Sequence, residues 1–220
     1  MKTLMDIDKL KKKLMGVVAT IRANHEELSR LDSDTGDGDH GVTMLRAVTA
    51  LERTVLGYHG SEMKALLLEV GWAVMGIDGG STGPLLGSLF LGMSDALGNK
   101  SEIDCPGLAV MFQAGIEKVQ QQTKAKIGDK TMMDALIPAV QALKQASQDG
   151  KSIYQALEAA AQAAENGARA TKDFQARFGR ARNLKERTIG FQDPGATSVA
   201  YIMKGFARIS HGPIHWSERS

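Results

Sequence analysis

Apolar residues recur every three or four positions along most of this chain, the spacing expected for one face of an α-helix. The first such stripe runs through residues 10–21 and the second through residues 44–55. Six further segments keep the helical spacing: 62–76, 83–98, 107–122, 131–147, 152–174 and 195–209. No segment alternates with a period of two, and Val and Ile are too sparse for a sheet. The pattern therefore predicts eight helices and an all-α fold.

The short links between these helices favour a bundle in which neighbouring helices are antiparallel. In such an up-and-down arrangement, alternate links lie at the same end of the bundle. The links that share one end are polar and contain glycine: 31–41, 78–84, 123–131 and 179–195. Plain turns are expected at the other end, in residues 57–60, 98–107 and 148–151. We therefore expect the chemistry of the molecule at one end only.

Each glycine-bearing link leads into the N-terminus of a helix, where free N–H groups and a partial positive charge favour an anion. The residues at or beside these starts are Gly41, Gly83, Asp129 and Gly195. Ser81 or Thr82, and Asp129, are predicted N-caps. Asp193 followed by Pro194 is typical of a cap and a first-turn proline. Any one link is explained by good capping alone, but the four together predict an anion-binding surface.

The composition is that of an ordinary globular protein, with 43% hydrophobic and 24% charged residues among 220. We expect residues 1–220 to form a single domain, with an irregular tail at about 211–220. The net charge of +2 is too small to indicate nucleic-acid binding. No apolar run approaches the roughly 20 residues that span a bilayer, so no membrane partner is expected.

The N-terminal residues are charged throughout and have no apolar signal core, which favours a cytoplasmic protein. The single Cys105 excludes an intramolecular disulfide and fits a reducing compartment. A lone cysteine of this kind is more often a buried, inert thiol than a nucleophile, and we predict the buried thiol.

The link "LDSDTGDGDHG", residues 31–41, holds four aspartates, which repel one another if all are ionised. It is not an EF-hand loop, because counting from Asp32 puts Asp37 where glycine belongs and Thr43 where glutamate belongs. Asp34, Thr35 and Gly36 form the Asp-Thr-Gly triplet that aspartic proteases use. Those enzymes need two such aspartates on β-rich lobes, whereas this chain is helical and has one copy. A nucleotide P-loop is also excluded, because "GDKT" lacks the preceding glycine spacing and the strand.

A hard-cation site remains. Asp32, Asp37 and Asp39 can converge if the glycines fold the link back on itself, and three carboxylates suit Mg²⁺. A cation would offset the repulsion, and phosphates would then lie between it and the helix starts. Phosphoryl transfer requires this electrostatic arrangement. Asp34 is expected to face solvent and to stay outside the site.

Five motifs resemble one known family and occur in its order over roughly residues 30–200: "LDSDTGDGDHG", "GGSTGPLLG", "GDKTMMDAL", "GRARNLKERTIG" and "QDPGATS". The sequence resembles the nucleotide-binding L subunit of dihydroxyacetone kinase and the homologous C-terminal domain of single-chain enzymes. The resemblance implies a barrel of eight antiparallel α-helices with the nucleotide site at one end, in agreement with the apolar pattern.

The resemblance also implies roles for individual residues. Asp32, Asp37 and Asp39 match the aspartates that hold two Mg²⁺ ions, which bridge the phosphates of ADP or ATP. The residues that match nucleotide-contacting positions are His40, Gly41, Val42, Thr43, Ser81, Thr82, Thr123, Met132, Arg180, Asp193, Pro194 and Gly195. Thr123 and Met132 match positions beside the adenine. Taken alone, Met132 would be interpreted as core, and His40 as a structural or capping residue without a role in proton transfer.

Arg180 lies in a long, glycine-flanked link, which suggests a lid over the phosphates. We call residues 179–191 the lid segment. Family members often carry "GRASYLGERSIGHQDPGA" here, and this chain departs from that pattern at Arg182, Asn183, Lys185 and Phe191.

The resemblance implies a division of labour, because the chain has no sugar-binding domain. A separate K subunit would hold dihydroxyacetone covalently through a histidine, and this chain would donate the γ-phosphoryl group. In one branch of the family, ADP stays bound and a phosphohistidine-donor M subunit of the sugar phosphotransferase system rephosphorylates it. In the other branch, ATP exchanges as an ordinary substrate. A free-standing chain leans towards the first branch.

Several alternatives stay open at this point. The ketose is set by the partner and could be a tetrulose such as erythrulose. A non-catalytic nucleotide-sensing module would keep the same pocket, and a structural Ca²⁺-binding bundle would keep the acidic link without a nucleotide. The sequence leaves the oligomeric state open, a homodimer included.

Overall fold

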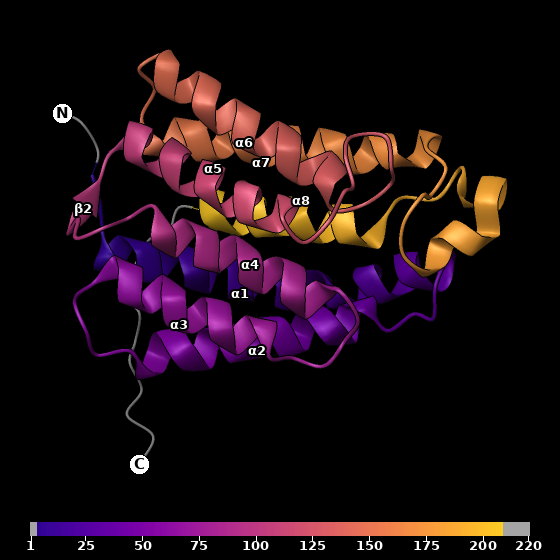
Figure 1. The fold of residues 1–220 in the computed structure, drawn as a ribbon, viewed down its shortest axis with the longest axis horizontal. Helices are drawn as coiled ribbons and strands as arrows, with labels where there is room; N and C mark the ends of the chain where they lie inside the picture. The colour runs from indigo at the N-terminus through magenta and orange to yellow at the C-terminus, as the bar shows by residue number, and fades with distance from the viewer. Residues whose placement is uncertain (1–3, 209–220) are drawn as a thin grey trace.

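The computed structural model describes residues 4–208, which are almost entirely helical (Figure 1). Within this range the chain forms eight α-helices: α1 (Ile7–Ser33), α2 (His40–Gly57), α3 (Met63–Met75), α4 (Thr82–Asp95), α5 (Cys105–Gln120), α6 (Met133–Gln148), α7 (Ile153–Ala170) and α8 (Pro194–Ala207). Two 3₁₀ segments, η1 (Thr171–Asp173) and η2 (Arg180–Thr188), lie between α7 and α8. The predicted all-α fold is confirmed, and the predicted tail at 211–220 lies outside the described residues.

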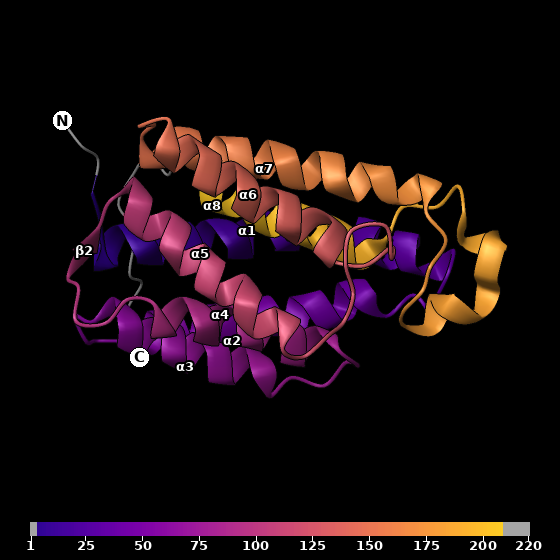
Figure 2. The same ribbon diagram turned by 45° about the horizontal axis from the view of Figure 1, so that its top comes forward.

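The eight helices form a closed ring. Each helix packs against the next one along the chain, and α8 packs against α1 to complete the circle. Figures 1 and 2 show the helices running roughly along the long axis, with α1 and α8 side by side. The apolar stripes that predicted the helices face inward, and one continuous core cluster receives residues from all eight. Burial of these stripes supplies the main stabilising free energy of the barrel.

One small piece of β-structure was not expected. Met5–Asp6 (β1) and Glu102–Ile103 (β2) form an antiparallel pair of two-residue strands, with Met5 opposite Ile103. A strand this short has no room to show an alternating pattern, so the sequence carries no signal for it. Met5 and Ile103 are both buried in the core, so this pair attaches the start of the chain to the α4–α5 link.

The predicted helix caps are partly right. Asp193 caps α8, with its carboxylate accepting the Ala196 N–H at 2.6 Å, and Pro194 is the first residue of the helix. Ser81 precedes α4 as predicted, although its side chain makes no capping hydrogen bond. The prediction that Asp129 caps the sixth helix is wrong, because α6 begins four residues later, at Met133.

The carboxylate of Asp129 instead accepts the N–H of Lys126 at 2.9 Å, inside the α5–α6 link. Asp134, in the first turn of α6, takes over the stabilising role. Its carboxylate accepts the N–H groups of Gly128 at 2.6 Å and of Thr131 at 2.7 Å. The link therefore wraps around a helix carboxylate before the helix starts, and this is why the start moves away from Asp129.

Two further expectations concern features away from the site. Cys105 is a free, buried cysteine as predicted, and burial raises the pKa of its thiol, which keeps it protonated and unreactive. Among the helices of the described range, none has the length and apolar character needed to cross a membrane.

Candidate functional site

The four glycine-bearing links meet at one end of the barrel, on the right in Figure 1. Together they line a cavity of about 700 Å³, a size typical of small-molecule and cofactor sites. Each link contributes, through residues that include Asp37, Ser81, Thr123 and Arg180. The expectation from link parity, that the chemistry gathers at one end, agrees with this arrangement.

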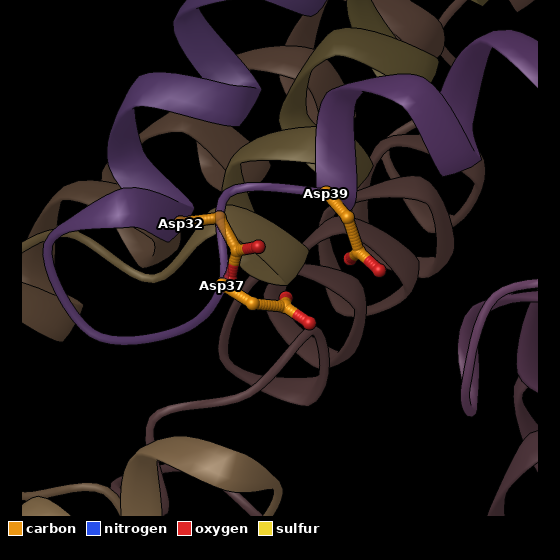
Figure 3. A group of neighbouring side chains, drawn as sticks. All are labelled: Asp32, Asp37 and Asp39. Carbon is orange, nitrogen blue, oxygen red and sulfur yellow. The ribbon is translucent and has the colours of Figure 1, made fainter.

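Three aspartates converge in the α1–α2 link (Figure 3). Asp32 belongs to the last turn of α1, Asp37 to the link itself and Asp39 to the position just before α2. One oxygen of each carboxylate lies within 4.8 Å of one oxygen of the other two. The link folds back because the N–H of Gly36 bonds to the carbonyl of Asp32 at 2.6 Å. Asp34 is exposed and does not line the cavity, as expected.

The positively charged neighbour of this cluster is Arg180 from the lid segment. Its guanidinium contacts the carboxylate of Asp37 and lies 3.9 Å from that of Asp39. It therefore offsets part of the negative charge that three adjacent carboxylates create. The donor set itself, carboxylate oxygens within reach of a single ion, is the chemistry that Mg²⁺ prefers. The residues present thus fit a divalent cation.

Nine of the predicted nucleotide-contacting residues line the cavity: His40, Ser81, Thr82, Thr123, Met132, Arg180, Asp193, Pro194 and Gly195. They include the first residues of α2, α4 and α8, so three helix N-termini open onto the same space as the aspartates. Free N–H groups at these starts and the partial positive charge of each helix end suit phosphate oxygens. The cavity thus combines a cation site with an anion-binding wall.

The remaining three, Gly41, Val42 and Thr43, do not line it. Val42 is 46% exposed on the outer face of α2. Gly41 packs against α1, where an added Cβ would lie 2.0 Å from the carbonyl oxygen of His25. Thr43 is only 1% exposed, and its hydroxyl has no hydrogen-bond partner among the described residues. Successive residues of a helix point about 100° apart, so a motif that matches in sequence cannot place all its members on one face.

Burial shifts the pKa values of both His40 and Asp193. The Nε2 atom of His40 lies 2.7 Å from the hydroxyl oxygen of Ser198 in a hydrogen bond between α2 and α8. Burial lowers the pKa of His40, which favours the neutral ring. Burial also raises the pKa of Asp193 to about 7, partly opposed by the N–H of Ala196 and by the nearby charge of Lys130.

Several cavity residues were not assigned to the site from the sequence. They include Lys130, Asn183 and Ser198. Lys130 lies in "GDKT", which was tested as a P-loop and also begins the family motif "GDKTMMDAL", so a signal was present. Asn183 was noted only as a departure from the family pattern in the lid segment, and Ser198 is the last residue of the "QDPGATS" motif, one turn into α8, but neither was given a role in the site.

The lid segment contains a strained residue at one of its departures from the family pattern. Lys185 interrupts η2 with φ 52° and ψ −127°, a conformation that glycine adopts readily and other residues avoid. The common family pattern has glycine at this position. The lysine therefore stores local strain in the segment that carries Arg180.

Replacing Lys185 with glycine should relieve this strain. We expect Lys185→Gly to stabilise the observed conformation of the lid segment by about 1 kcal/mol, which slows amide hydrogen exchange there several-fold. The comparison variant is Arg187→Gly, since Arg187 is two residues away and has no positive φ. It should accelerate exchange instead, and equal exchange in both variants would contradict the strain at Lys185.

Comparison with known proteins adds independent information. A family model described as the DAK2 domain matches residues 34–208. The chain is 38% identical over 182 residues to the ADP-binding subunit DhaL of the PEP-dependent dihydroxyacetone kinase of Escherichia coli, covering 83% of this chain and 87% of that protein. It is 35% identical over 184 residues to a D-erythrulose kinase of Mycolicibacterium smegmatis, covering 83% of this chain and 32% of that enzyme.

A solved structure matches as well. The dihydroxyacetone kinase from C. freundii in complex with AMP-PNP and Mg²⁺ superposes with a TM-score of 0.69 at 26% identity. The match covers 90% of this chain and 33% of that enzyme, so the chain corresponds to about a third of its length.

Proposed function

Because the chain belongs to the DAK2-domain family, we propose that it is the nucleotide-carrying subunit of a dihydroxyacetone kinase. The observation that carries this proposal is the convergence of Asp32, Asp37 and Asp39 in a cavity that three helix N-termini also line. A nucleoside diphosphate or triphosphate with its divalent cation has the charge distribution that this cavity complements. The complex of a related kinase with AMP-PNP and Mg²⁺ supports the same ligand class.

The residues of the site divide the task of binding. The three aspartates would hold Mg²⁺, two ions by analogy with the family. N–H groups in the first turns of α4 and α8, such as that of Gly195, would donate to the phosphates. When bound, Mg²⁺ neutralises phosphate charge and so favours the transfer of the γ-phosphoryl group. Thr123 and Met132, on the α5–α6 side of the cavity, would contact the adenine. Arg180 would cover the phosphates from the lid segment.

A complete reaction needs partners. In the proposed cycle, the terminal hydroxyl of dihydroxyacetone, held by a separate K subunit through a histidine, attacks the γ-phosphorus of bound ATP. The bond between the γ-phosphorus and the β,γ-bridging oxygen breaks, the hydroxyl proton is released, and the ADP that forms stays bound to this chain. A phosphohistidine of an M subunit then returns a phosphoryl group to ADP in place. The relatives that align over most of their own length are named as ADP-binding subunits of PEP- or PTS-dependent kinases, which supports this branch. We assign the choice of ketose to the K subunit.

Denaturing the purified protein and identifying the released nucleotide tests the proposal. We expect about one ADP per chain that resists prior dialysis, because ions and helix starts hold the phosphates together. An empty site that binds ATP reversibly would shift the assignment to the ATP-dependent branch. A protein that neither carries nor binds adenine nucleotide would overturn the proposal.

Turnover separates a kinase subunit from a nucleotide sensor. With a K subunit, a phosphohistidine donor and dihydroxyacetone, we expect dihydroxyacetone phosphate to form only when this chain is present. If the chain retains ADP but supports no turnover, it binds nucleotide without taking part in phosphoryl transfer, and its assignment as a kinase subunit is wrong.

A further inference from the structure

Lys130 combines burial, strain and charge in an unusual way. It is only 3% exposed, although lysine is among the residues least often buried. Its φ of 59° lies in the left-handed region, which costs a lysine free energy that a glycine would not pay. Burial and this backbone conformation are both unfavourable for a lysine, which indicates that the side chain has a specific role.

The ammonium group of Lys130 joins two distant parts of the chain. It donates to the carbonyl of Thr171, at the end of α7, at 2.5 Å. It also donates to the carbonyl of Phe191, at the end of the lid segment. The Lys130 ammonium therefore contacts both the beginning and the end of the connection between α7 and α8.

Two backbone donors reinforce the same junction. The N–H of Asp193 donates to the hydroxyl of Thr171 at 2.8 Å, and the N–H of Gly190 donates to the carbonyl of Lys172 at 2.7 Å. Burial lowers the pKa of the Lys130 amine, but the carboxylates of Asp193, Asp134 and Asp173 favour its charged form. The Lys130 side chain therefore lies beside acidic groups at a junction that backbone hydrogen bonds also close.

We propose that Lys130 is a positioning residue, which fixes the base of the lid segment and thereby holds Arg180 against Asp37. A loop with both ends pinned samples far fewer conformations than one with a free end. Arg180 sits on this loop, and its guanidinium contacts Asp37 and lies 3.9 Å from the carboxylate of Asp39. Lys130, the lysine of "GDKT", thus binds backbone carbonyls rather than a phosphate group.

Hydrogen exchange of the nucleotide-free protein tests the junction directly. In Lys130→Met, we expect the amides of Gly190 and Asp193 to exchange at least about tenfold faster, because their hydrogen bonds lie at the released junction. Amides of α1–α5 should be unchanged. Lys130→Gln, too short to reach both carbonyls, should act in the same direction and is measured in case the methionine variant does not fold. Lys124→Met, an exposed lysine in the same link, is the matched control and should have no effect.

Unchanged exchange at Gly190 and Asp193 in a folded variant would overturn the proposal. Faster exchange spread evenly over all helices would do the same, since it would show only general destabilisation.

A second measurement tests the action through Arg180 and rests on the proposed function. We expect Lys130→Met to release bound ADP about tenfold faster, and to add nothing further in an Arg180→Ala background. Additive effects of the two substitutions would contradict positioning through Arg180. If the protein binds no ADP at all, the proposed function fails while the exchange result for Lys130 still stands or falls separately.

Discussion

Replacing Asp37 with alanine is expected to weaken Mg²⁺-dependent retention of ADP by at least about 100-fold. Even residues that only orient metal ligands typically cost 10–100-fold in metal affinity when they are removed, so the loss of a direct ligand should cost more. Asp37 is central to the cluster, since it shares the 4.8 Å group with Asp32 and Asp39 and is also the carboxylate that Arg180 contacts. Calorimetric titration of ADP with Mg²⁺ or with a chelator measures the effect.

Asp34 provides the matched control. It lies in the same link and carries the same charge, but it is exposed and outside the cavity. Asp34→Ala should therefore retain ADP as the wild-type protein does. If Asp37→Ala binds ADP and Mg²⁺ with wild-type affinity, the assignment of the metal to this cluster is wrong. An equal loss in both variants would point to net charge in the link rather than to a defined set of ligands.

The second large effect concerns stability. Gly41→Ala is expected to lower the free energy of unfolding by about 3 kcal/mol, at the upper end of the usual cost of overpacking. The added Cβ would lie 2.0 Å from the carbonyl oxygen of His25 and 2.9 Å from the amide nitrogen of Ser29. Both are backbone atoms of α1, so the two helices would have to separate. The melting temperature, measured without nucleotide, should fall by roughly 6–12 °C for a protein of this size.

Gly57→Ala is the control for this prediction. Gly57 is the last residue of the same helix, and a Cβ there would meet nothing within 4 Å. We expect its stability to be unchanged or raised by up to about 1 kcal/mol, the difference in helix propensity. A Gly41→Ala variant as stable as Gly57→Ala would show that α1 and α2 can separate freely, and the nucleotide role implied for Gly41 would then need direct measurement.

The arrangement of the helices was predictable because it follows from the regular spacing of apolar residues and from the short links between helices. Apolar spacing defines each helix, and short links force antiparallel neighbours, so the common location of links such as 31–41 and 179–195 follows without any tertiary information. The convergence of Asp32, Asp37 and Asp39 also agrees with prediction, since the intervening glycines permit the turn that folds the link back, Gly38 with a φ of 76°.

What could not be predicted depends on side-chain direction and on long-range contacts. Val42 follows His40 closely in the motif, yet the helical rotation turns it to the outer face. Aspartate is a residue type that favours the N-cap, which is why Asp129 was predicted there. Asp134 instead accepts the N–H groups of the link from the first turn of α6. The task of Lys130 depends on two carbonyls that lie 41 and 61 residues further along the chain. No local pattern encodes such contacts.

The ring closure between α1 and α8 has a consequence for the durability of the fold. This seam brings together helices from opposite ends of the described chain, so it is the contact with the largest entropy cost of loop closure. The cavity straddles it, with the aspartate link on one side and Asp193 on the other. A ligand bound there would act as a reversible cross-link between the two ends of the chain, and this seam could open only after the ligand departs. Kinetic resistance to heat and proteases should therefore increase with nucleotide occupancy.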